Sequence, residues 1–275
     1  MNIVLLTNSQ PNQVALVNKI YSKNQNISII LKTSVNEPIS AKNIFSLNKI
    51  YLSVFSLGAI FAYKKVWSKL QRYFDLRYPS FPIDPLFEVD DINDPRVALE
   101  IQKIKPDLVI ISGTNILKIK LIEEIELTGR IMNLHTGISP YVKGGPNCTN
   151  WCLFNKEFSF IGNTVMWLDS GIDSGNIIAT EQTNLSGQES LYDLHVKVLE
   201  HAHDLYIRAI QDFMNGIILP NISQESIEEG TLHLSKDWTP GKIFMSCFNF
   251  YFFYQQGIVS SNKKIGSISL VDLSR

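Results

Sequence analysis

Short apolar segments that alternate with helical segments place the strongest constraint on how this chain can fold. Residues 2–7 and 27–31 are apolar and of strand length. Between them, residues 14–22 have helical spacing after Pro11, a residue suited to the first turn of a helix. A further apolar run, 108–111, continues the pattern. Strands that alternate with helices predict a parallel α/β sheet, and ligands of such sheets bind beyond the carboxyl ends of the strands.

A carboxamide and an imidazole occupy alternate positions after an apolar segment, and a carboxylate follows in a glycine-containing turn. These groups belong to Asn133, His135 and Asp173. Residues i and i+2 of a strand project from the same face, so the first two side chains should emerge together. Together the three groups can support attack of an amine on an acyl carbon. The amide would donate to the oxyanion, the imidazole would handle a proton or donate to the same oxygen, and the carboxylate would orient the imidazole. The alternative is a turn asparagine and a hydrogen-bonded histidine at a strand end.

The sequence around these groups carries a resemblance to a known family. Residues 133–145 read Asn-Leu-His-Thr-Gly-Ile-Ser-Pro-Tyr-Val-Lys-Gly-Gly, and a predicted strand over 162–168 leads into the turn at 169–175. The two blocks resemble the active-site segments of N10-formyltetrahydrofolate-dependent formyltransferases, most closely the bacterial sugar-nucleotide N-formyltransferases. The similarity runs from Met1 to about Gly216. It implies that Asn133, His135 and Asp173 form the catalytic trio and that N10-formyltetrahydrofolate is the co-substrate.

The resemblance also indicates where the two substrates bind. The loop after residues 108–111 corresponds to the pterin-binding loop of the family. Contacts with the donor are therefore expected from Ser112, Gly113, Thr114, Asn115, Ile116, Leu117 and Asp169. Contacts with the acceptor are expected from Tyr141, Lys143, Gly144 and Asn147. Lys143 suits a phosphate as a point charge, although the family often has arginine here. Each of these residues could instead simply order its own loop.

Neither a dinucleotide nor a metal is expected. The segment 7–11 after the first predicted strand lacks a Gly-x-Gly-x-x-Gly pattern, so NAD and FAD are disfavoured. Cys148 and Cys152 have no second Cys or His pair at matching spacing, so they are interpreted as ordinary buried thiols.

Composition narrows the partners and the location. The net charge of −1 and the pI of about 6.5 argue against a nucleic-acid partner, which would favour a basic surface. Three cysteines and the lack of a signal-like start favour a reducing cytoplasm. The apolar stretch 50–63 is shorter than the roughly 20 residues that span a bilayer. No membrane partner is therefore expected, and a buried helix or an oligomer interface explains the stretch better.

Two regions fall outside the family-like pattern. Residues 40–82 resemble an insertion with helical stretches at 41–48 and 63–74, expected to pack over the sheet edge rather than to shape the acceptor pocket. The pattern Ser-Gly-Gln-Glu at 186–189 predicts a capping box for a long helix. On that helix, His195, His201 and His203 are expected at surface or boundary positions. The helix would complete a catalytic domain over 1–216. Residues 217–275 would form a C-terminal extension, which could mediate the formation of a homodimer.

The predicted secondary structure of this extension has three parts. Residues 231–234 and 265–270 are expected to be strands, and 242–254 an aromatic-rich helix or strand. The fold expected for the whole chain is α/β: a Rossmann-like, mostly parallel sheet with helices on both faces, plus a small C-terminal extension.

The predicted activity is transfer of a formyl group from N10-formyltetrahydrofolate to a primary amine on a small molecule, with a nucleotide-linked amino sugar preferred. Four alternatives stay open. They are a formyltetrahydrofolate hydrolase, a methionyl-tRNA or a glycinamide ribonucleotide formyltransferase, and a non-catalytic folate- or nucleotide-binding module.

Overall fold

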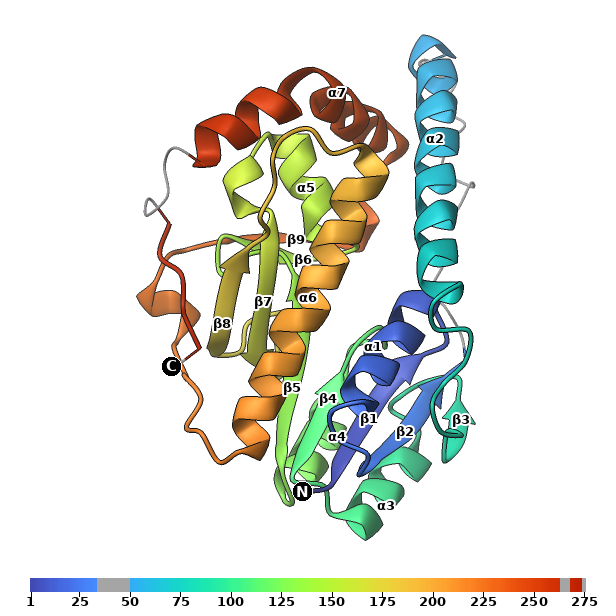
Figure 1. Cartoon of the computed structure of the whole chain (residues 1–275), viewed down its shortest axis with the longest axis vertical. Helices are drawn as coiled ribbons and strands as arrows, with labels where there is room; N and C mark the ends of the chain where they lie inside the picture. Colours follow the sequence, from blue (N-terminus) through green and yellow to red (C-terminus); the bar gives the residue numbers. More distant parts are fainter. Residues whose placement is uncertain (34–49, 263–267, 274–275) are drawn as a thin grey trace.

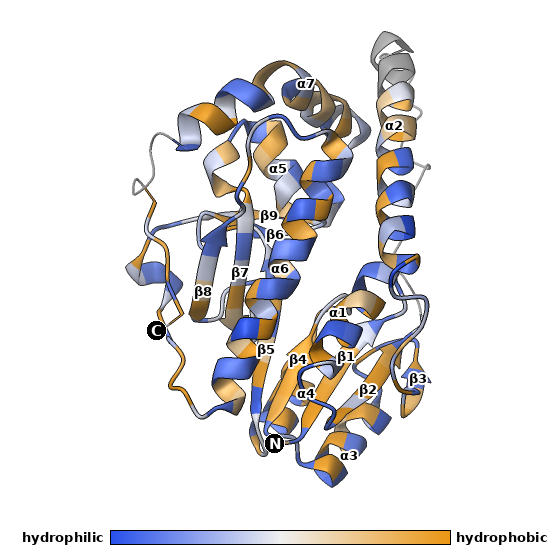
Figure 2. Cartoon of the chain, viewed as in Figure 1, coloured by the Kyte–Doolittle hydropathy of each residue, from blue (hydrophilic) through white to orange (hydrophobic). Residues whose placement is uncertain are grey.

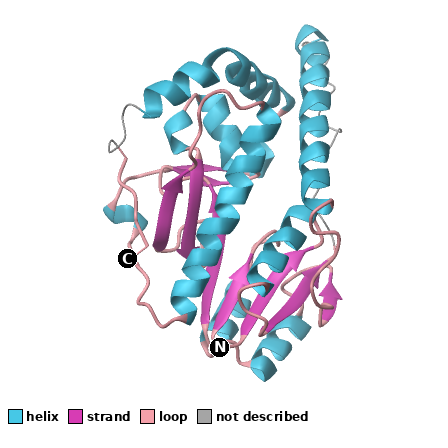
Figure 3. Cartoon of the chain, viewed as in Figure 1, coloured by secondary structure: helices cyan, strands magenta, loops and turns pink. Residues whose placement is uncertain are grey.

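A mixed sheet with helices on both faces forms the centre of the molecule (Figures 1 and 3). The computed structural model describes residues 1–33, 50–262 and 268–273 of the chain. Within these residues the main sheet has seven strands. In spatial order they are β3 (Phe87–Val89), β2 (Ile27–Lys32), β1 (Ile3–Asn8), β4 (Leu108–Ile111), β5 (Arg130–Thr136), β7 (Gly162–Trp167) and β8 (Ile177–Gln182).

The strand directions confirm the expected mostly parallel sheet. Strands β3, β2, β1, β4 and β5 pair in parallel, whereas β7 is antiparallel to both β5 and β8. Asn133 of β5 lies opposite Ile111, the last residue of β4, and opposite Met166 of β7. The end of β5 therefore lies between the parallel part of the sheet and the β7–β8 hairpin.

Alternate residues of the central strands face two different helical layers. Ile3 and Leu5 of β1 belong to a core shared with α1 (Pro11–Tyr21) and α6 (Leu191–Met214). Val4 and Leu6 belong to a second core, with α3 (Pro95–Ile104) and α4 (Ile119–Glu126). Figure 2 shows these strands as strongly hydrophobic. A strand buried on both faces needs such a continuous apolar sequence, which explains the apolar segments noted above.

A long helix rises from the edge of the molecule, visible as α2 in Figure 1. It runs from Ile50 to Asp75 and includes the predicted helix 63–74. It packs against α1, α6 and α7 (Pro240–Asn262), with Leu70 and Phe74 fully buried. Its main contacts are thus with other helices. The predicted helix at 41–48 lies outside the described residues.

Helix α7 packs against α5 (Cys148–Asn155) at one end of the molecule. Strand β9 (Thr231–His233) pairs in parallel with β6 (Val142–Gly144). Three short 3-10 helices complete the described elements: η2 (Phe158–Phe160), η3 (Gln224–Ser226) and η4 (Ser235–Asp237).

Two predictions for this region are confirmed and one is wrong in part. Residues 231–233 form a strand, and the aromatic-rich segment lies in helix α7. The strand predicted over 265–270 is not formed at 268–270, and its earlier residues lie outside the described part. A hydrogen bond from the Thr180 backbone N–H to the Val271 carbonyl instead joins the following segment to β8.

Two local predictions about α6 are wrong. Its N-cap is Ser190, whose side chain accepts from the Asp193 N–H, rather than Ser186. Ser186 and Glu189 do bond to each other, but in a turn where Gly187 has a φ of +82° and the chain is not yet helical. His195 and His203, expected at the surface or its boundary, are buried because they lie on the inner side of α6.

In the described part of the chain, no helix combines the length and the apolar character needed to cross a bilayer.

Candidate active site

Three polar side chains predicted from separate sequence blocks lie together at the end of β5. The strand carries Asn133 and His135, and the loop between β7 and β8 carries Asp173. The Nδ2 atom of Asn133 donates to Asp173 Oδ1 at 3.3 Å. The Nδ1 atom of His135 lies 3.2 Å from Asp173 Oδ2. The backbone N–H of Gly144 donates to the same Oδ2 at 3.0 Å. One carboxylate thus joins β5, the β7–β8 loop and β6.

Both ring nitrogens of His135 face hydrogen-bond acceptors. Nε2 lies 3.2 Å from the Val142 carbonyl, on the side opposite Asp173. A neutral imidazole has one N–H and can donate to only one of these oxygens, whereas the imidazolium form can donate to both. The ring is buried, with 7% of its surface exposed. In this conformation its nitrogens are directed at protein groups.

A cavity of about 810 Å³ lies in front of this cluster. Its wall includes Asn8, Lys32 and Ile111, the last residues of β1, β2 and β4, together with Asn133 of β5. This is the position at which open α/β sheets bind ligands. Asn133 and Asp173 line the cavity, whereas His135 lies behind them. The expected donation from His135 to a substrate oxygen is therefore not formed in this geometry.

Most of the residues predicted to contact the donor also line the cavity. They are Gly113, Thr114, Asn115, Ile116, Leu117 and Asp169. Ser112 does not line it; the Ser112 N–H instead donates to the Leu6 carbonyl, continuing the pairing of β4 with β1. The loop is held by Asn8, whose Nδ2 donates to the Gly113 carbonyl at 2.5 Å. Gly113 has a φ of +75° and an added Cβ would lie 2.9 Å from Asn8, so glycine fits this turn closely.

Of the four residues predicted to contact the acceptor, only Gly144 lines the cavity. The Tyr141 ring stacks on Phe160 with centroids 4.7 Å apart, so one of its two faces is covered. Asn147 is the N-cap of α5 and accepts from the Thr149 N–H. Lys143 lies on β6, opposite Leu232 of β9.

Several residues of the wall were missed by the sequence analysis. Trp67 comes from α2, Asn8 and Lys32 are the last residues of β1 and β2, and Gln10 is the N-cap of α1. A further group begins at the last residue of β9: His233, Leu234, Ser235 and Lys236. The rule that ligands bind at the carboxyl ends of parallel strands could have identified the β1 and β2 residues. No local motif indicated Trp67 or the C-terminal group.

The C-terminal part of the wall is anchored by backbone and ring contacts. The Gly145 N–H donates to the His233 carbonyl at 3.0 Å. The His233 ring stacks on Trp151, with centroids 4.2 Å apart. Burial lowers the pKa of His233, which favours its neutral form. This part of the wall is therefore packed against α5.

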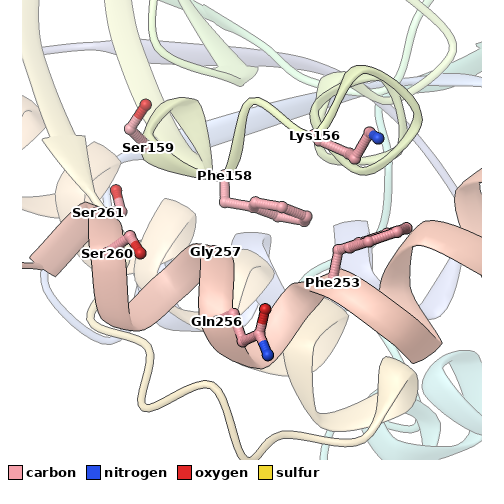
Figure 4. A pocket seen from close by; sticks show the side chains of 8 residues that line it. All are labelled: Lys156, Phe158, Ser159, Phe253, Gln256, Gly257, Ser260 and Ser261. Atoms are coloured by element: carbon pink, nitrogen blue, oxygen red, sulfur yellow. The ribbon is translucent and has the colours of Figure 1, made fainter.

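A second, more open cavity of about 470 Å³ lies between η2 and α7 (Figure 4). It is lined by Lys156, Phe158, Ser159, Phe253, Gln256, Gly257, Ser260 and Ser261. It contains neither the polar cluster nor the ends of the parallel strands, so it lacks the groups that acyl transfer requires.

The cysteines near the site are buried thiols, as interpreted from the sequence. Cys148 and Cys152 are both free and lie in α5. Burial raises the pKa of both thiols, which disfavours the reactive thiolate. Within the described residues, no group of three or more His, Cys, Asp or Glu side chains could hold a metal ion.

Fold and cavity define the class of protein: an α/β, Rossmann-like protein whose candidate site lies at the carboxyl ends of the parallel strands. The family model described as formyl transferase matches residues 1–210, and the chain belongs to this family.

Individual comparisons differ in the acceptor that they name. A methionyl-tRNA formyltransferase from Clostridium tetani is 29% identical over 141 residues, which cover 51% of this chain and 43% of that protein. The match thus spans less than half of the length of that relative. A sugar N-formyltransferase structure from a Shewanella species has a TM-score of 0.54 at 16% identity, covering 89% of this chain and 87% of that one.

A third comparison includes bound ligands. An N-formyltransferase structure from Helicobacter canadensis, in complex with folinic acid and dTDP-3-aminofucose, has a TM-score of 0.53 at 16% identity. It covers 92% of this chain and 81% of that one. At these identities the structural matches establish the fold.

Proposed function

We propose that this protein transfers a formyl group from N10-formyltetrahydrofolate to the primary amine of a small molecule, with a nucleotide-linked amino sugar as the acceptor class. The observation that carries the proposal is the Asp173 carboxylate, bonded to Asn133 and close to His135, at the wall of a cavity of about 810 Å³. Membership of the formyl transferase family supports the reaction type.

The proposed chemistry uses two residues of the wall directly. The neutral amine attacks the formyl carbon. This carbon becomes tetrahedral, and its oxygen becomes an oxyanion. The Asn133 amide donates to this oxygen, while Asp173 accepts the amine proton directly or through a water molecule. The bond between the carbon and N10 then breaks, N10 takes a proton, and the formamide is released.

His135 acts one step away from the reacting atoms in this proposal. It holds the Asp173 carboxylate from the side opposite the cavity. When both of its nitrogens are protonated, it can donate to Asp173 and to the Val142 carbonyl together. The carboxylate is then kept in the orientation in which its free lone pairs face the substrate amine.

The donor is proposed to bind at the loop that includes Gly113 to Leu117, with Asp169 across the cavity. The acceptor is proposed to bind near Gly144 and the segment 233–236. The catalytic domain proposed for residues 1–216 thus needs the extension at 217–275 to complete its cavity.

Methionyl-tRNA is the second candidate acceptor, because the Clostridium tetani relative is a methionyl-tRNA formyltransferase. The net charge of −1 favours a small molecule instead, since tRNA binding normally requires a basic surface.

A direct assay separates these possibilities. The 275-residue chain is incubated with N10-formyltetrahydrofolate and, in separate reactions, with amino-sugar nucleotides, glycinamide ribonucleotide or charged methionyl-tRNA. Formation of a formamide on an amino-sugar nucleotide supports the proposal. Transfer to methionyl-tRNA alone would replace the acceptor class, and donor consumption without any amine would identify a hydrolase. No donor binding and no turnover would leave a non-catalytic module.

A further inference from the structure

A segment beyond the family-matched residues is bonded to both ends of the loop that carries Asp173. Before the loop, the Trp167 Nε1 donates to the Pro220 carbonyl at 3.3 Å. After the loop, Ile177 and Ile222 exchange backbone hydrogen bonds of 2.8 and 3.0 Å in an antiparallel bridge. The family match ends at residue 210. The following chain is therefore fixed against the β7–β8 loop.

Gln224 reaches from this segment into the loop itself. It is the first residue of η3 and is buried, with 5% of its surface exposed. Its Nε2 donates to the carbonyl oxygens of Asp173 and Gly175, at 2.8 Å each. Both amide hydrogens are thus used. The opposite orientation would direct the side-chain oxygen at two carbonyl oxygens, so the hydrogen-bonding pattern fixes the amide as described.

The backbone that Gln224 holds is one that the chain does not adopt readily. Asp173 has a φ of +48°, a left-handed conformation that costs a non-glycine residue about 1 kcal/mol or more. The loop also turns tightly, because a Cβ at Gly175 would lie 1.8 Å from the Trp167 carbonyl oxygen. Surrounding contacts must therefore maintain the conformation, and the two bonds from Gln224 act on the constrained residue and on the end of its turn.

We propose that Gln224 is a positioning residue for formyl transfer, which holds the Asp173 backbone so that its carboxylate stays between Asn133 and His135. The inference rests on the proposed function. It assigns to the segment after residue 216 a role in the geometry of the reacting groups, in addition to its place in the cavity wall.

The chain contains a matched control. Asn249 of α7 is also buried, and its Nδ2 also donates to two backbone carbonyls, those of Leu153 and Phe154 at 3.1 and 2.7 Å. These carbonyls lie at the end of α5 and do not line the main cavity. Gln224→Met and Asn249→Leu each remove a double donor while keeping a similar side-chain length.

The first readout is kinetic. Gln224→Met should lower kcat by about 10- to 100-fold, because a shift of about 1 Å in a reacting group can cost about 100-fold. Its KM for the donor should change by less than about threefold, since ground-state contacts are retained. Asn249→Leu should keep kcat and KM near the wild-type values, even if its Tm falls as far as that of Gln224→Met. Equal kcat values for the two variants would overturn the proposal.

A second variant tests the hydrogen bond itself. In Gln224→Glu, the ionised carboxylate would face two carbonyl oxygens, whereas the protonated form can donate to one of them. Its kcat relative to wild type should therefore rise as the pH falls, and the same ratio for Gln224→Met should not. Parallel profiles for the two variants would contradict a donor role.

Hydrogen–deuterium exchange separates this proposal from the proposed function, because it does not require turnover. Amides of residues 168–176 should exchange faster in Gln224→Met than in wild type. In Asn249→Leu, their exchange rates should equal those of wild type. Unaltered exchange in both variants would refute the positioning role, whether or not the wild-type protein transfers formyl groups. Faster exchange without any wild-type turnover would retain the loop contact and reject formyl transfer. If Gln224→Met fails to fold, Gln224→Glu provides the same exchange measurement.

Discussion

Oδ2 of Asp173 lies 3.2 Å from Nδ1 of His135, whereas the other ring nitrogen of His135, Nε2, faces the Val142 carbonyl. The same carboxylate accepts from Asn133 and from the Gly144 backbone. It is thus bonded by groups from two strands while still lining the cavity. A side chain held in this way has little freedom to rotate, which suits a group that must meet a substrate proton in one position.

Asp173→Asn should lower kcat by about 100- to 10,000-fold, because it removes the proposed base while keeping the shape of the side chain. The Tm should stay close to that of wild type. Asp204→Asn, on the exposed surface of α6, is the control for loss of one negative charge. Steady-state kinetics with saturating donor measure both variants, and a near-normal kcat for Asp173→Asn would remove it from the mechanism.

Asn133→Leu should lower kcat by about 100- to 1,000-fold, the usual effect of removing one oxyanion donor. The KM values should change little, because the donation is strongest in the transition state. Single-turnover measurements with excess enzyme isolate this step from product release. A variant that weakens donor binding without slowing the chemical step would assign Asn133 to ground-state binding instead.

Local sequence patterns predicted those parts of the fold that depend on neighbouring residues. The apolar segments at 27–31 and 108–111 became buried strands because both of their faces are covered by helices. Asn133 and His135 lie on one strand, and their spacing was sufficient to place them together. The position of Asp173 required the family resemblance, since nothing local indicates that the β7–β8 hairpin returns its loop to β5.

The cavity wall was harder to predict because long-range contacts build it. Strand β9 has three residues and pairs with β6 across a long sequence separation, so no periodic signal indicates that His233 to Lys236 reach the site. Tyr141 and Asn147 were predicted to contact the acceptor, but ring stacking and helix capping use these side chains. A polar residue in a loop has several partners available, and the fold determines which one it takes.

Gly144→Ala should disrupt the junction between β6, β9 and the candidate site. Gly144 has a φ of +93°, and an added Cβ would lie 1.9 Å from the His233 carbonyl oxygen. We expect a loss of about 2 kcal/mol or more in the free energy of unfolding, together with a lower kcat, because the Gly144 N–H also bonds to Asp173. Urea unfolding and steady-state kinetics measure the two effects.

The control for this substitution is Gly58→Ala, in the interior of α2, where no atom lies within 4 Å of the new Cβ. It should raise the free energy of unfolding by roughly 0.5–1 kcal/mol, because alanine loses less backbone entropy in a helix. A Gly144→Ala protein as stable as wild type would mean that β9 can move away from β6 at little cost.

The two buried histidines of α6 should make the protein less stable in mild acid. Burial lowers the pKa of His195 to about 4 and that of His203 to about 3, from an ordinary value of 6.5. The unfolded chain therefore binds more protons than the folded chain below pH 6.5. Each neutral buried ring contributes stability above this pH and loses it as the pH falls towards its folded-state pKa, by up to about 1.4 kcal/mol per pH unit.

Urea unfolding between pH 7.5 and 4.5 should show a smaller decline in unfolding free energy for His203→Gln than for wild type. The Nδ1 atom of His203 lacks a hydrogen-bond partner among the described residues, and its ring packs beside Phe74 with centroids 5.6 Å apart. Leu199→Ala supplies the control, because Leu199 belongs to the same cluster as Phe74 but does not titrate. It should lower stability by a similar amount at every pH. A His203→Gln curve parallel to that of wild type would mean that the ring gains a proton without unfolding, through an opening of α6 that admits water.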